Sequence, residues 1–542
     1  MRATNVAFAM IVALYFASIF SMSTMNALEA STASLPLIFA IGALLGLFLV
    51  SRANVGVPVL SGGEHLIAWL AAAVLSAPRI AYLFEQSFGV AVNAVCWDDW
   101  WRIQQLASLS YSPSYPPLST FDSDLYLSFY YAPWMAGAVA RVTGIVAGIK
   151  PAIFINHSLL ILSVCYLAVF AGQVLFNDPK RRRAFLLLMF LFGGFDAFPA
   201  VASGLGALVK GGQVLPTSSE WWPTVFGLHM HFPDFTSLAL WVPHHLAAAA
   251  ALPLAAFIFF RSNGSYGSFL AGGIAAFALF SSAFAFIGAI PFLIIFLCMY
   301  SFRMRHLSIA LASLIVFSLP LVWIYLRPDS AIGFNFFGAL IGPLAEYKIA
   351  IALVFIIVLV LEFLPLWLLI FDRSRKPAGN RMDRLVLITA IAFLISTFFI
   401  AYGGTSNNYA GRGSILSIWA LVYIAVRTSG DVLKERFASP VMRFVLLAYL
   451  FGSIFSYLAF SAQAVRSLQA SFTPFNELVL RSNLSDSRTT PADLIEQAEQ
   501  TNFGWYMLEK FKDQPKPTMF LADKELMSGG NALRLSLPNL LD

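Results

Sequence analysis

Two adjacent aspartates, Asp98 and Asp99, stand among three tryptophans in the stretch 95–102, which reads VCWDDWWR. Carboxylates at the point where a chain leaves a bilayer are costly to desolvate without a partner or a task. One of them could accept a proton from a hydroxyl group while its neighbour orients that group or raises the basicity of the first. The alternative is structural: the pair caps a surface helix and the tryptophans form an interfacial belt. We expect a catalytic role for Asp98 and Asp99.

A group of histidines offers a second kind of chemistry. Four of the seven histidines fall within seventeen residues, namely His229, His231, His244 and His245. Their nitrogens are numerous enough for zinc, but cysteine and glutamate partners at metal spacing are missing and nearby prolines interrupt any common helix. The other interpretations are a phosphate or sugar contact by His244 or His245, and histidines that lie at a polar interface. A divalent metal is therefore possible but not indicated, and no cofactor is expected.

An arginine between two glycines is the third candidate. Arg412 lies between Gly411 and Gly413, directly before an apolar run. Its guanidinium fork matches two phosphate oxygens, and flanking glycines let backbone N–H groups approach the same anion. An arginine that snorkels to a lipid headgroup is the alternative. We expect Arg412 to bind a phosphate that gains charge as it leaves, because a cation already in place then lowers the barrier.

The composition assigns these residues to a membrane protein. Of the 542 residues, 59% are hydrophobic and 11% are charged, whereas a soluble domain carries about 25% charged residues. The three cysteines are too few for a disulfide scaffold and lack metal-ligand spacing. In a membrane protein basic residues mostly set orientation, so the net charge of +6 does not indicate a nucleic-acid partner.

About thirteen apolar runs are long enough to cross a bilayer, since a spanning helix needs about 20 mostly apolar residues. The runs extend over residues 5–21, 35–51, 64–84, 152–176, 184–201, 240–260, 266–283, 285–302, 307–326, 347–371, 384–402, 413–428 and 441–463. The sequence thus predicts an all-α polytopic membrane protein. The apolar stretch 125–148 is predicted to lie along the surface or to re-enter, because counting it as a span would export the basic residues 180–183.

The basic loops predict the orientation. They extend over residues 180–183, 303–305, 373–384 and 427–436, all on one side of the predicted bundle. The positive-inside bias makes this side cytoplasmic. The exported loops are poor in Lys and Arg and extend over residues 85–124, 203–239, 327–346 and 403–412. We therefore expect a multi-pass protein of the inner (cytoplasmic) membrane, with a cytoplasmic N-terminus and an exported C-terminus.

Two regions are predicted. Residues 1–463 form the transmembrane domain, whose exported loop 85–151 carries the candidate site, and residues 464–542 form a small exported C-terminal region. The first run is expected to be an uncleaved anchor, with a cleaved signal peptide as the alternative. Thr490 and the proline after it predict the start of a helix that ends near Phe511.

Two acids, Asp196 and Glu362, lie within predicted spans, where ionisable groups usually face the interior of a bundle or a water-filled cavity. For Glu362 we expect a structural hydrogen bond or salt bridge. Asp196 is predicted nearer the exported side and could line the cavity of the site.

Several of these stretches resemble the GT-C class, integral-membrane glycosyltransferases that use polyprenyl-phosphate-linked sugars. The likeness lies in the acidic pair with a surface helix after it, and in the tyrosine and proline stretch 115–117. The segments 241–245 (WVPHH) and 407–414 (NNYAGRGS) resemble patterns in bacterial members of the class. The acidic loop usually follows the first span in this class, whereas here it follows the third predicted span.

The resemblance implies an inverting sugar transfer on the exported face, from a polyprenyl-phosphate donor to a glycan or lipid acceptor. By position Asp98 matches the base of the class; relatives often have Glu at the place of Asp99, so the role stays open between the two. Arg412, His244 and His245 would hold the donor phosphate. The other expected substrate contacts are Trp97, Trp100, Trp101, Tyr115, Asp122, Asp124, Trp221 and Trp222. Tryptophan rings suit the C–H faces of sugars, while Asp122 and Asp124 could instead cap a helix.

Two other functions are compatible with the sequence. A polysaccharide polymerase or ligase acting on lipid pyrophosphate-linked chains would depend on exported arginines and histidines more than on an acidic pair. A lipid or sugar transporter would place ionisable residues near the middle of the bilayer, with broken helices in paired positions. Here the polar residues gather in the outer loops, which favours an enzyme.

Overall fold

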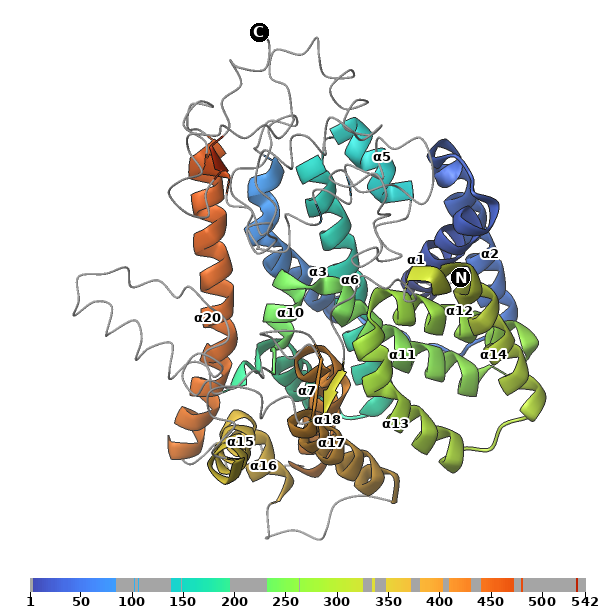
Figure 1. The fold of residues 1–542 in the computed structure, drawn as a ribbon. Coiled ribbons are helices and arrows are strands. Elements are labelled where there is room, and N and C mark those ends of the chain that lie inside the picture. Colours follow the sequence, from blue (N-terminus) through green and yellow to red (C-terminus); the bar gives the residue numbers. More distant parts are fainter. Residues whose placement is uncertain are drawn as a thin grey trace.

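The computed structural model is built almost entirely of helices (Figure 1). It describes residues 3–83, 102, 106, 138–147, 149–194, 232–262, 264–324, 334–336, 348–371, 381–402, 409–429, 440–471, 479–480 and 533–534. Several helices are long and apolar, so the all-α architecture is consistent with a polytopic membrane protein. The predicted helix at 490–511 and the predicted cavity residue Asp196 lie outside the described residues.

The helices in chain order are α1 (Ala3–Leu28), α2 (Leu35–Ala53), α3 (Gly62–Ser76), α5 (Ala138–Ala147), α6 (Ile149–Leu175), α7 (Pro179–Leu191), α10 (Phe235–Trp241), α11 (Pro243–Arg261), α12 (Ser265–Ser281), α13 (Ala283–Met299), α14 (Met304–Ser318), α15 (Lys348–Glu362), α16 (Leu364–Ile370), α17 (Arg381–Phe399), α18 (Ile415–Ser429) and α20 (Pro440–Ser471). Short 3₁₀ and π-helical turns accompany them: η1 (Thr32–Ser34), η2 (Ala77–Leu83), η4 (Leu319–Ile324) and η7 (Tyr409–Gly413). Two small antiparallel ribbons pair β1 (Phe334–Phe336) with β2 (Ile400–Tyr402), and β3 (Val479–Leu480) with β4 (Leu533–Arg534).

A described helix occupies each of the thirteen predicted apolar runs. By length and composition, six helices in the described part can cross a membrane, or up to seven if the bent pair α15–α16 is one span. Four further apolar helices are shorter: α12, α13, α18 and a part of α20. The chain is therefore a multi-pass membrane protein. Of the thirteen predicted crossings, six or seven are long enough within the described residues, and the full number stays a prediction. The described part of the surface segment, α5, has 10 residues and reaches only about 15 Å, half of a bilayer core.

The helices form a buried centre and an apolar rim. In α1 and α11, 72% of the most apolar 18 residues are buried, against 22% in α2 and 17% in α14. The latter two lie toward one edge of the bundle (Figure 1) and expose large apolar side chains such as Leu44 and Ile315. Lipid tails are as apolar as leucine, so such a surface is stable in a bilayer and unfavourable in water.

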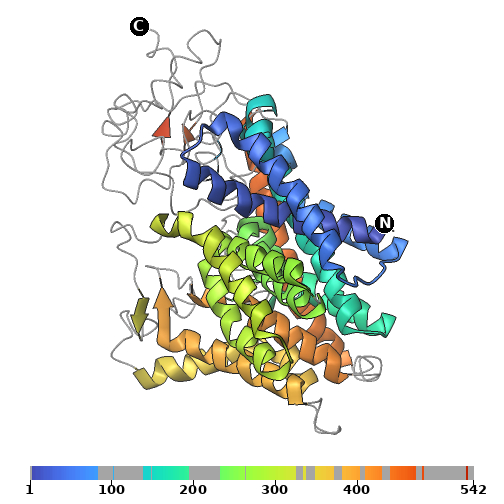
Figure 2. The same cartoon turned by 90° about the vertical axis from the view of Figure 1, so that its right-hand side faces the viewer.

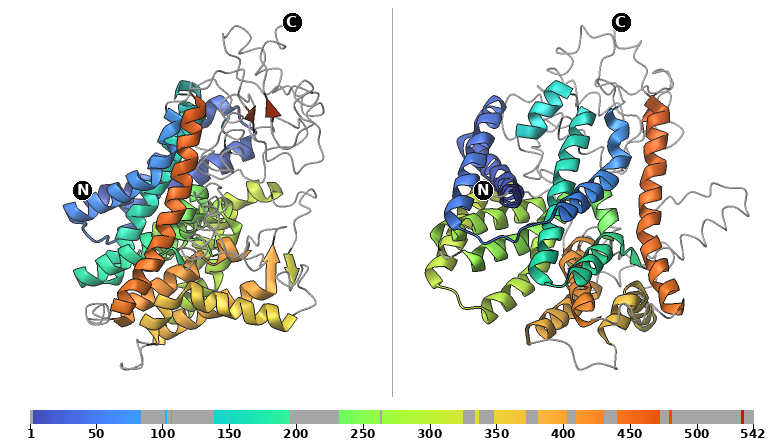
Figure 3. Two further views of the ribbon diagram at one scale, coloured as in Figure 1. Left: turned by 90° about the vertical axis from the view of Figure 1, so that its left-hand side faces the viewer. Right: turned by 180° about the vertical axis from the view of Figure 1, so that it is seen from behind.

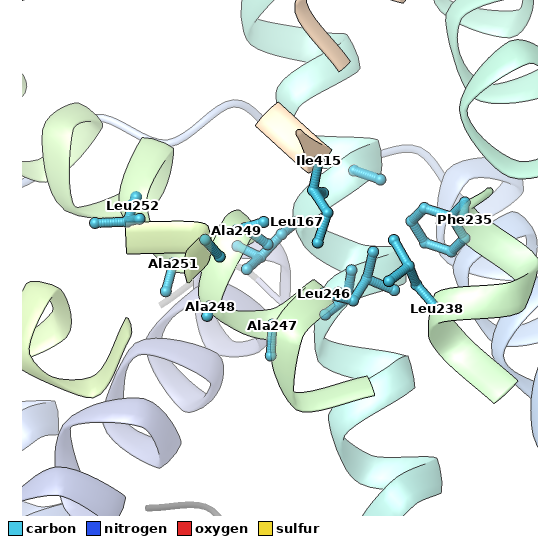
Figure 4. Packing of buried hydrophobic residues seen from close by; sticks show 14 of the residues in the cluster. Leu167, Phe235, Leu238, Leu246, Ala247, Ala248, Ala249, Ala251, Leu252 and Ile415 are labelled. Carbon is cyan, nitrogen blue, oxygen red and sulfur yellow. The ribbon is translucent and has the colours of Figure 1, made fainter. Parts of the chain in front are cut away.

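Small side chains and one buried hydrogen bond define the centre. Five successive alanines, Ala247–Ala251, let α11 pack closely against its neighbours (Figure 4). On α1, the hydroxyl of Tyr15 lies 2.7 Å from Ser163 Oγ, and its ring stacks on Phe277 with 4.3 Å between centroids. α1 therefore supplies part of this core.

One end of the bundle gathers basic residues. Arg182, at the start of α7, lies 3.4 Å from Glu64 in the first turn of α3. Arg427, in the last turn of α18, lies 3.7 Å from Asp383 at the start of α17. We call the end of the bundle that carries the Arg182–Glu64 and Arg427–Asp383 ion pairs the basic end. Figure 2 shows the N-terminus and the β1–β2 ribbon on opposite sides of the molecule.

Two irregular features interrupt the bundle. The axes of α15 and α16 meet at 72°, with Phe363 between them. The segment after α7 crosses α20, the long helix along one flank (Figure 3), so closely that the N–H of Gly193 donates to the carbonyl oxygen of Tyr449 at 3.0 Å. A Cβ atom on Gly193 would overlap the backbone of α20. Gly194, next to the crossing, and Phe363, at the bend, both line a pocket described below.

Candidate functional site

Arg412 lies in the π-helical turn η7, which precedes α18. The other residues of this turn are buried, whereas Arg412 is half-buried. Tyr409 anchors the turn to α17: its ring centroid lies 5.2 Å from that of Phe393, and its hydroxyl lies 3.2 Å from Ser396 Oγ. π-Helical turns inside or beside α-helices occur frequently at functional sites, and here the turn leaves the arginine accessible at the start of a buried helix.

α13 approaches this turn at Gly288. A Cβ atom at Gly288 would overlap the carbonyl oxygen of Gly413, the residue after Arg412. The contact is backbone to backbone, so a flexible side chain cannot move aside to relieve it. Glycine is therefore required at 288 for α13 and η7 to pack as they do.

Gly288→Ala is expected to displace η7 and to destabilise the protein by about 1–3 kcal/mol, the usual cost of overpacking. The thermal midpoint of the detergent-solubilised protein measures the effect. Gly63→Ala is the matched control, because a Cβ atom at Gly63 meets nothing within 4 Å. Equal midpoints for the two variants would contradict the close packing of α13 on the arginine turn.

The histidine pair lies at a break between two helices. α10 ends at Trp241, Val242 leaves the helical conformation (φ −133°, ψ 61°), and Pro243 opens α11. Proline is tolerated in a first turn because its missing N–H would have no helical partner there. His244 and His245 follow, with ring centroids 4.0 Å apart, and His245 is only 6% exposed. The break thus places two imidazoles at the start of a buried helix.

Arg102 reaches this break from the first predicted exported loop. It is 3% exposed, and its Nη2 donates to the carbonyl oxygen of Trp241 at 2.6 Å. Arg102 is not among the site residues predicted from the sequence. One signal was available: Arg102 is the only basic residue between positions 85 and 124.

The arginines and histidines converge. Arg102 and Arg412 both interact electrostatically with His244 and with His245. Two more fully buried residues join them, because His157 on α6 interacts with Arg79, Arg102 and His244. We call this set the cationic cluster; its members are Arg79, Arg102, His157, His244, His245 and Arg412. Guanidinium forks and imidazole N–H groups suit phosphate oxygens.

The cationic cluster lies at the end of the bundle away from the basic end. α11 begins with the histidine pair and finishes at Arg261, and α18 begins after Arg412 and carries Arg427 in its last turn. α3 begins at the Glu64–Arg182 ion pair and leads to Arg79. α11 has 19 residues and is about 28 Å long, close to the thickness of a hydrocarbon core.

An apolar pocket adjoins the cationic cluster. It is lined by Leu188, Met189, Phe192, Gly194, Phe232, Pro233, Asp234, Phe235, Leu238, Glu362, Phe363, Ile415, Ile418, Trp419 and Val422. Leu238 is three residues before Trp241, and Ile415 is three residues after Arg412. Figure 4 shows Ile415 and Leu238 close to Leu246 at the start of α11. The pocket and the cluster are therefore about one helical turn apart.

Two carboxylates line this pocket. Asp234 caps α10, where its side chain accepts hydrogen bonds from the N–H of Ser237 and, at 3.1 Å, from Ser456 Oγ. Glu362, at the end of α15, is 3% exposed and lies against Gly194, whose positive φ of 68° and missing Cβ make room for the carboxylate. Glu362 is buried, as predicted for an acid within a span, whereas Asp234 is not among the residues predicted from the sequence.

Burial raises the pKa of Asp234 to about 6, although hydrogen bonds from Ser237 and Ser456 favour the charged form. In the unfolded chain the ordinary pKa is 3.8, so between about pH 4 and 6 the folded protein keeps a proton that the unfolded chain loses. The stability that the folded protein gains from holding this proton is complete below about pH 4 and is lost as the pH rises through 6. Since a tenfold change in proton affinity is worth about 1.4 kcal/mol, the loss is at most about 3 kcal/mol.

Asp234→Asn should therefore stabilise the protein at pH 8 and have little effect at pH 4. Asparagine caps helices as well as aspartate does, so the cap itself is retained. Thermal midpoints of both proteins from pH 4 to 8 measure the difference. Asp178→Asn makes the same replacement at the exposed N-cap of α7. It controls for any effect of asparagine at a helix cap that does not depend on burial. A gap between wild type and Asp234→Asn that stays constant with pH would contradict the prediction.

The structure brings together three of the residues selected from the sequence: Arg412, His244 and His245. Their binding of phosphate stays a prediction. The other selected residues, Trp97, Asp98, Asp99, Trp100, Trp101, Tyr115, Asp122, Asp124, Trp221 and Trp222, lie outside the described residues. Within the described ranges, no group of three or more His, Cys, Asp or Glu side chains is arranged to hold a metal ion.

Comparison of the chain with protein-family models, with curated proteins and with solved structures finds no match. Its architecture is that of an all-helical membrane protein, and the comparisons identify no family.

Proposed function

We propose that this chain is a membrane enzyme that transfers a sugar from a polyprenyl-phosphate-linked donor to a glycan or lipid acceptor. The observation that carries the proposal is the convergence of Arg412 with His244 and His245, joined by Arg102, one helical turn from an apolar pocket. Such a donor has an anionic phosphate next to an apolar chain. A cationic cluster bordered by apolar side chains suits both parts of it.

The acidic pair is close to the cationic cluster along the chain. Asp98 and Asp99 precede Arg102 by four and three residues. Four residues of fully extended chain span at most about 14 Å. Covalent geometry therefore keeps the backbone of both aspartates within about 14 Å of the backbone of Arg102, which supports a reaction centre shared by the acids and the cluster.

In the proposed reaction the acceptor hydroxyl gives its proton to Asp98, and its oxygen attacks the anomeric carbon of the donor sugar. The bond between that carbon and the phosphate oxygen breaks, and the electron pair stays on the phosphate. The donor phosphate diester carries one negative charge, and the departing polyprenyl phosphate approaches two. Arg412 and the histidines therefore stabilise the transition state more than the bound donor. A single displacement of this kind inverts the configuration at the carbon.

The proposal includes the topology expected from the sequence. Thirteen crossings, a cytoplasmic N-terminus and an exported C-terminus put the basic end in the cytoplasm, as the positive-inside bias requires. The cationic cluster then faces the exported side of the inner membrane. Trp97, Trp100, Trp101, Tyr115, Asp122, Asp124, Trp221 and Trp222 remain the expected substrate contacts.

The direct test is sugar transfer by the purified chain in proteoliposomes. Polyprenyl-phosphate-linked hexoses are supplied singly with a mixture of glycan and lipid acceptors, and release of polyprenyl phosphate is measured. Acceptor-dependent release is the expected result. Release only from pyrophosphate-linked chains would instead support a polymerase or ligase.

The transporter alternative also has an observation in its favour. The pocket contains two carboxylates, and one of them adjoins the 72° bend between α15 and α16. Buried acids and interrupted helices occur at transporter sites. Movement of labelled substrate across the vesicle membrane without any covalent product would support transport and overturn the enzyme proposal.

A further inference from the structure

We propose that Arg102 is a positioning residue that holds the start of α11, and with it His244 and His245, against the first exported loop. The hydrogen-bond part of this inference rests on described contacts alone. Its consequence for catalysis rests on the proposed function.

The break between α10 and α11 removes a helical hydrogen bond. In a continuous helix the carbonyl oxygen of Trp241 would accept from the N–H of His245, four residues later. Here the N–H of His245 donates to the carbonyl oxygen of Val242 at 3.0 Å instead. The carbonyl oxygen of Trp241 therefore lies at a helix end, where it accepts from a donor outside the helix.

Arg102 supplies the replacement donor. Its Nη2 lies 2.6 Å from the carbonyl oxygen of Trp241, and its side chain is 3% exposed. The two residues are 139 positions apart in the chain, so this contact joins distant segments. Trp241 itself is half-buried, and a hydrogen bond from an ionised N–H donor is stronger than one from a neutral donor.

The same contact couples two groups of functional residues. Arg102 follows the Asp98-Asp99 pair by four and three residues, while Trp241 precedes the histidine pair by three and four. A hydrogen bond between their two segments limits how far the acids can move from the imidazoles. In the proposed reaction this separation must fit an acceptor hydroxyl and a donor phosphate, so loss of the contact should affect turnover more than donor binding.

Two length-matched variants test the hydrogen bond. Arg102→Lys keeps a long side chain with a charged donor, whereas Arg102→Met keeps the length and has no donor. Amide hydrogen exchange of residues 242–246 in the detergent-solubilised full chain reports opening of the junction without needing a substrate. We expect exchange there to be about tenfold or more faster in Arg102→Met and near the wild-type rate in Arg102→Lys. Exchange within α12 serves as the internal reference.

Each outcome has a defined meaning. Wild-type exchange at 242–246 in Arg102→Met would overturn the proposal. If Arg102→Met also loosens α12, the lysine variant decides: restored protection at the junction supports the donor role, and exchange as fast as in the methionine variant overturns it. Arg303→Gln, at the exposed start of α14, should leave the junction unchanged.

Kinetics separate this proposal from the proposed function. In the transfer reaction Arg102→Met should lower kcat by about 10²-fold, as expected for misplaced reactants, with a much smaller change in donor KM, and Arg102→Lys should recover part of the loss. If the wild type transfers no sugar, the proposed function fails while the exchange result still stands. If the wild type is active and Arg102→Met turns over normally, the catalytic part of this inference fails alone.

Discussion

Replacing Asp98 with asparagine is expected to lower the turnover of sugar transfer by about 10²- to 10⁴-fold, the range that a general base contributes. The amide has nearly the same shape as the carboxylate but cannot take the proton of the acceptor hydroxyl. Donor binding should change little, because the acid acts on the acceptor. Initial rates of polyprenyl phosphate release at saturating donor measure the effect in proteoliposomes.

Asp99→Asn is the matched control for this substitution, since the two aspartates are adjacent and the sequence leaves the role open between them. A smaller loss in Asp99→Asn assigns the base to Asp98. A larger loss in Asp99→Asn would transfer the role to Asp99. Full activity in Asp98→Asn would remove Asp98 from the mechanism.

Arg412→Gln is expected to lower turnover by about 10²- to 10³-fold, as removal of a donor that stabilises transition-state charge usually does. Glutamine keeps polar N–H groups but has no charge to set against the departing phosphate. The turnover of Arg412→Lys should lie between those of the wild type and Arg412→Gln, because lysine keeps the charge and loses the bidentate contact. Rates of donor cleavage, together with binding of polyprenyl phosphate to each variant, give the measurement.

Arg303→Gln removes the same charge from an exposed position at the start of α14 and should retain wild-type rates.

A comparison of the activity lost in the Arg412 variants with the activity lost in Asp98→Asn also tests the reaction class. Large losses in Arg412 and His245 variants, combined with a small loss in Asp98→Asn, would favour a polymerase or ligase over the proposed transferase. Wild-type turnover in Arg412→Gln would exclude this arginine from donor activation.

The helices were predictable because a membrane requires long apolar runs, and every predicted run contains a helix. The lengths were harder to predict, since an apolar run does not reveal where its helix ends. α7 finishes at Leu191, just before a pair of glycines that passes α20 at backbone distance. The run 347–371 divides into α15 and α16 at Phe363, although its hydropathy is continuous.

The site was predictable only where unusual residues stand together in the sequence. The glycines around Arg412 and the adjacency of His244 and His245 were visible signals. Arg102, Arg79 and His157 gave weaker signals, because none of them stands beside another arginine or histidine in the sequence. They acquire meaning through contacts between segments, such as the one that joins Arg102 to Trp241 across 139 positions.

Both α11 and α18 begin at the cationic cluster, and this has a consequence for how the site would respond to pH. The aligned peptide dipoles of a helix give its first turns the equivalent of about half a positive charge. That charge belongs to the main chain and is not titrated. With arginines that stay protonated at any physiological pH, a bound anion would keep most of its attraction when the imidazoles are neutral. Retention of a lipid phosphate should therefore weaken little in alkaline surroundings, unlike binding at a site built on histidinium alone.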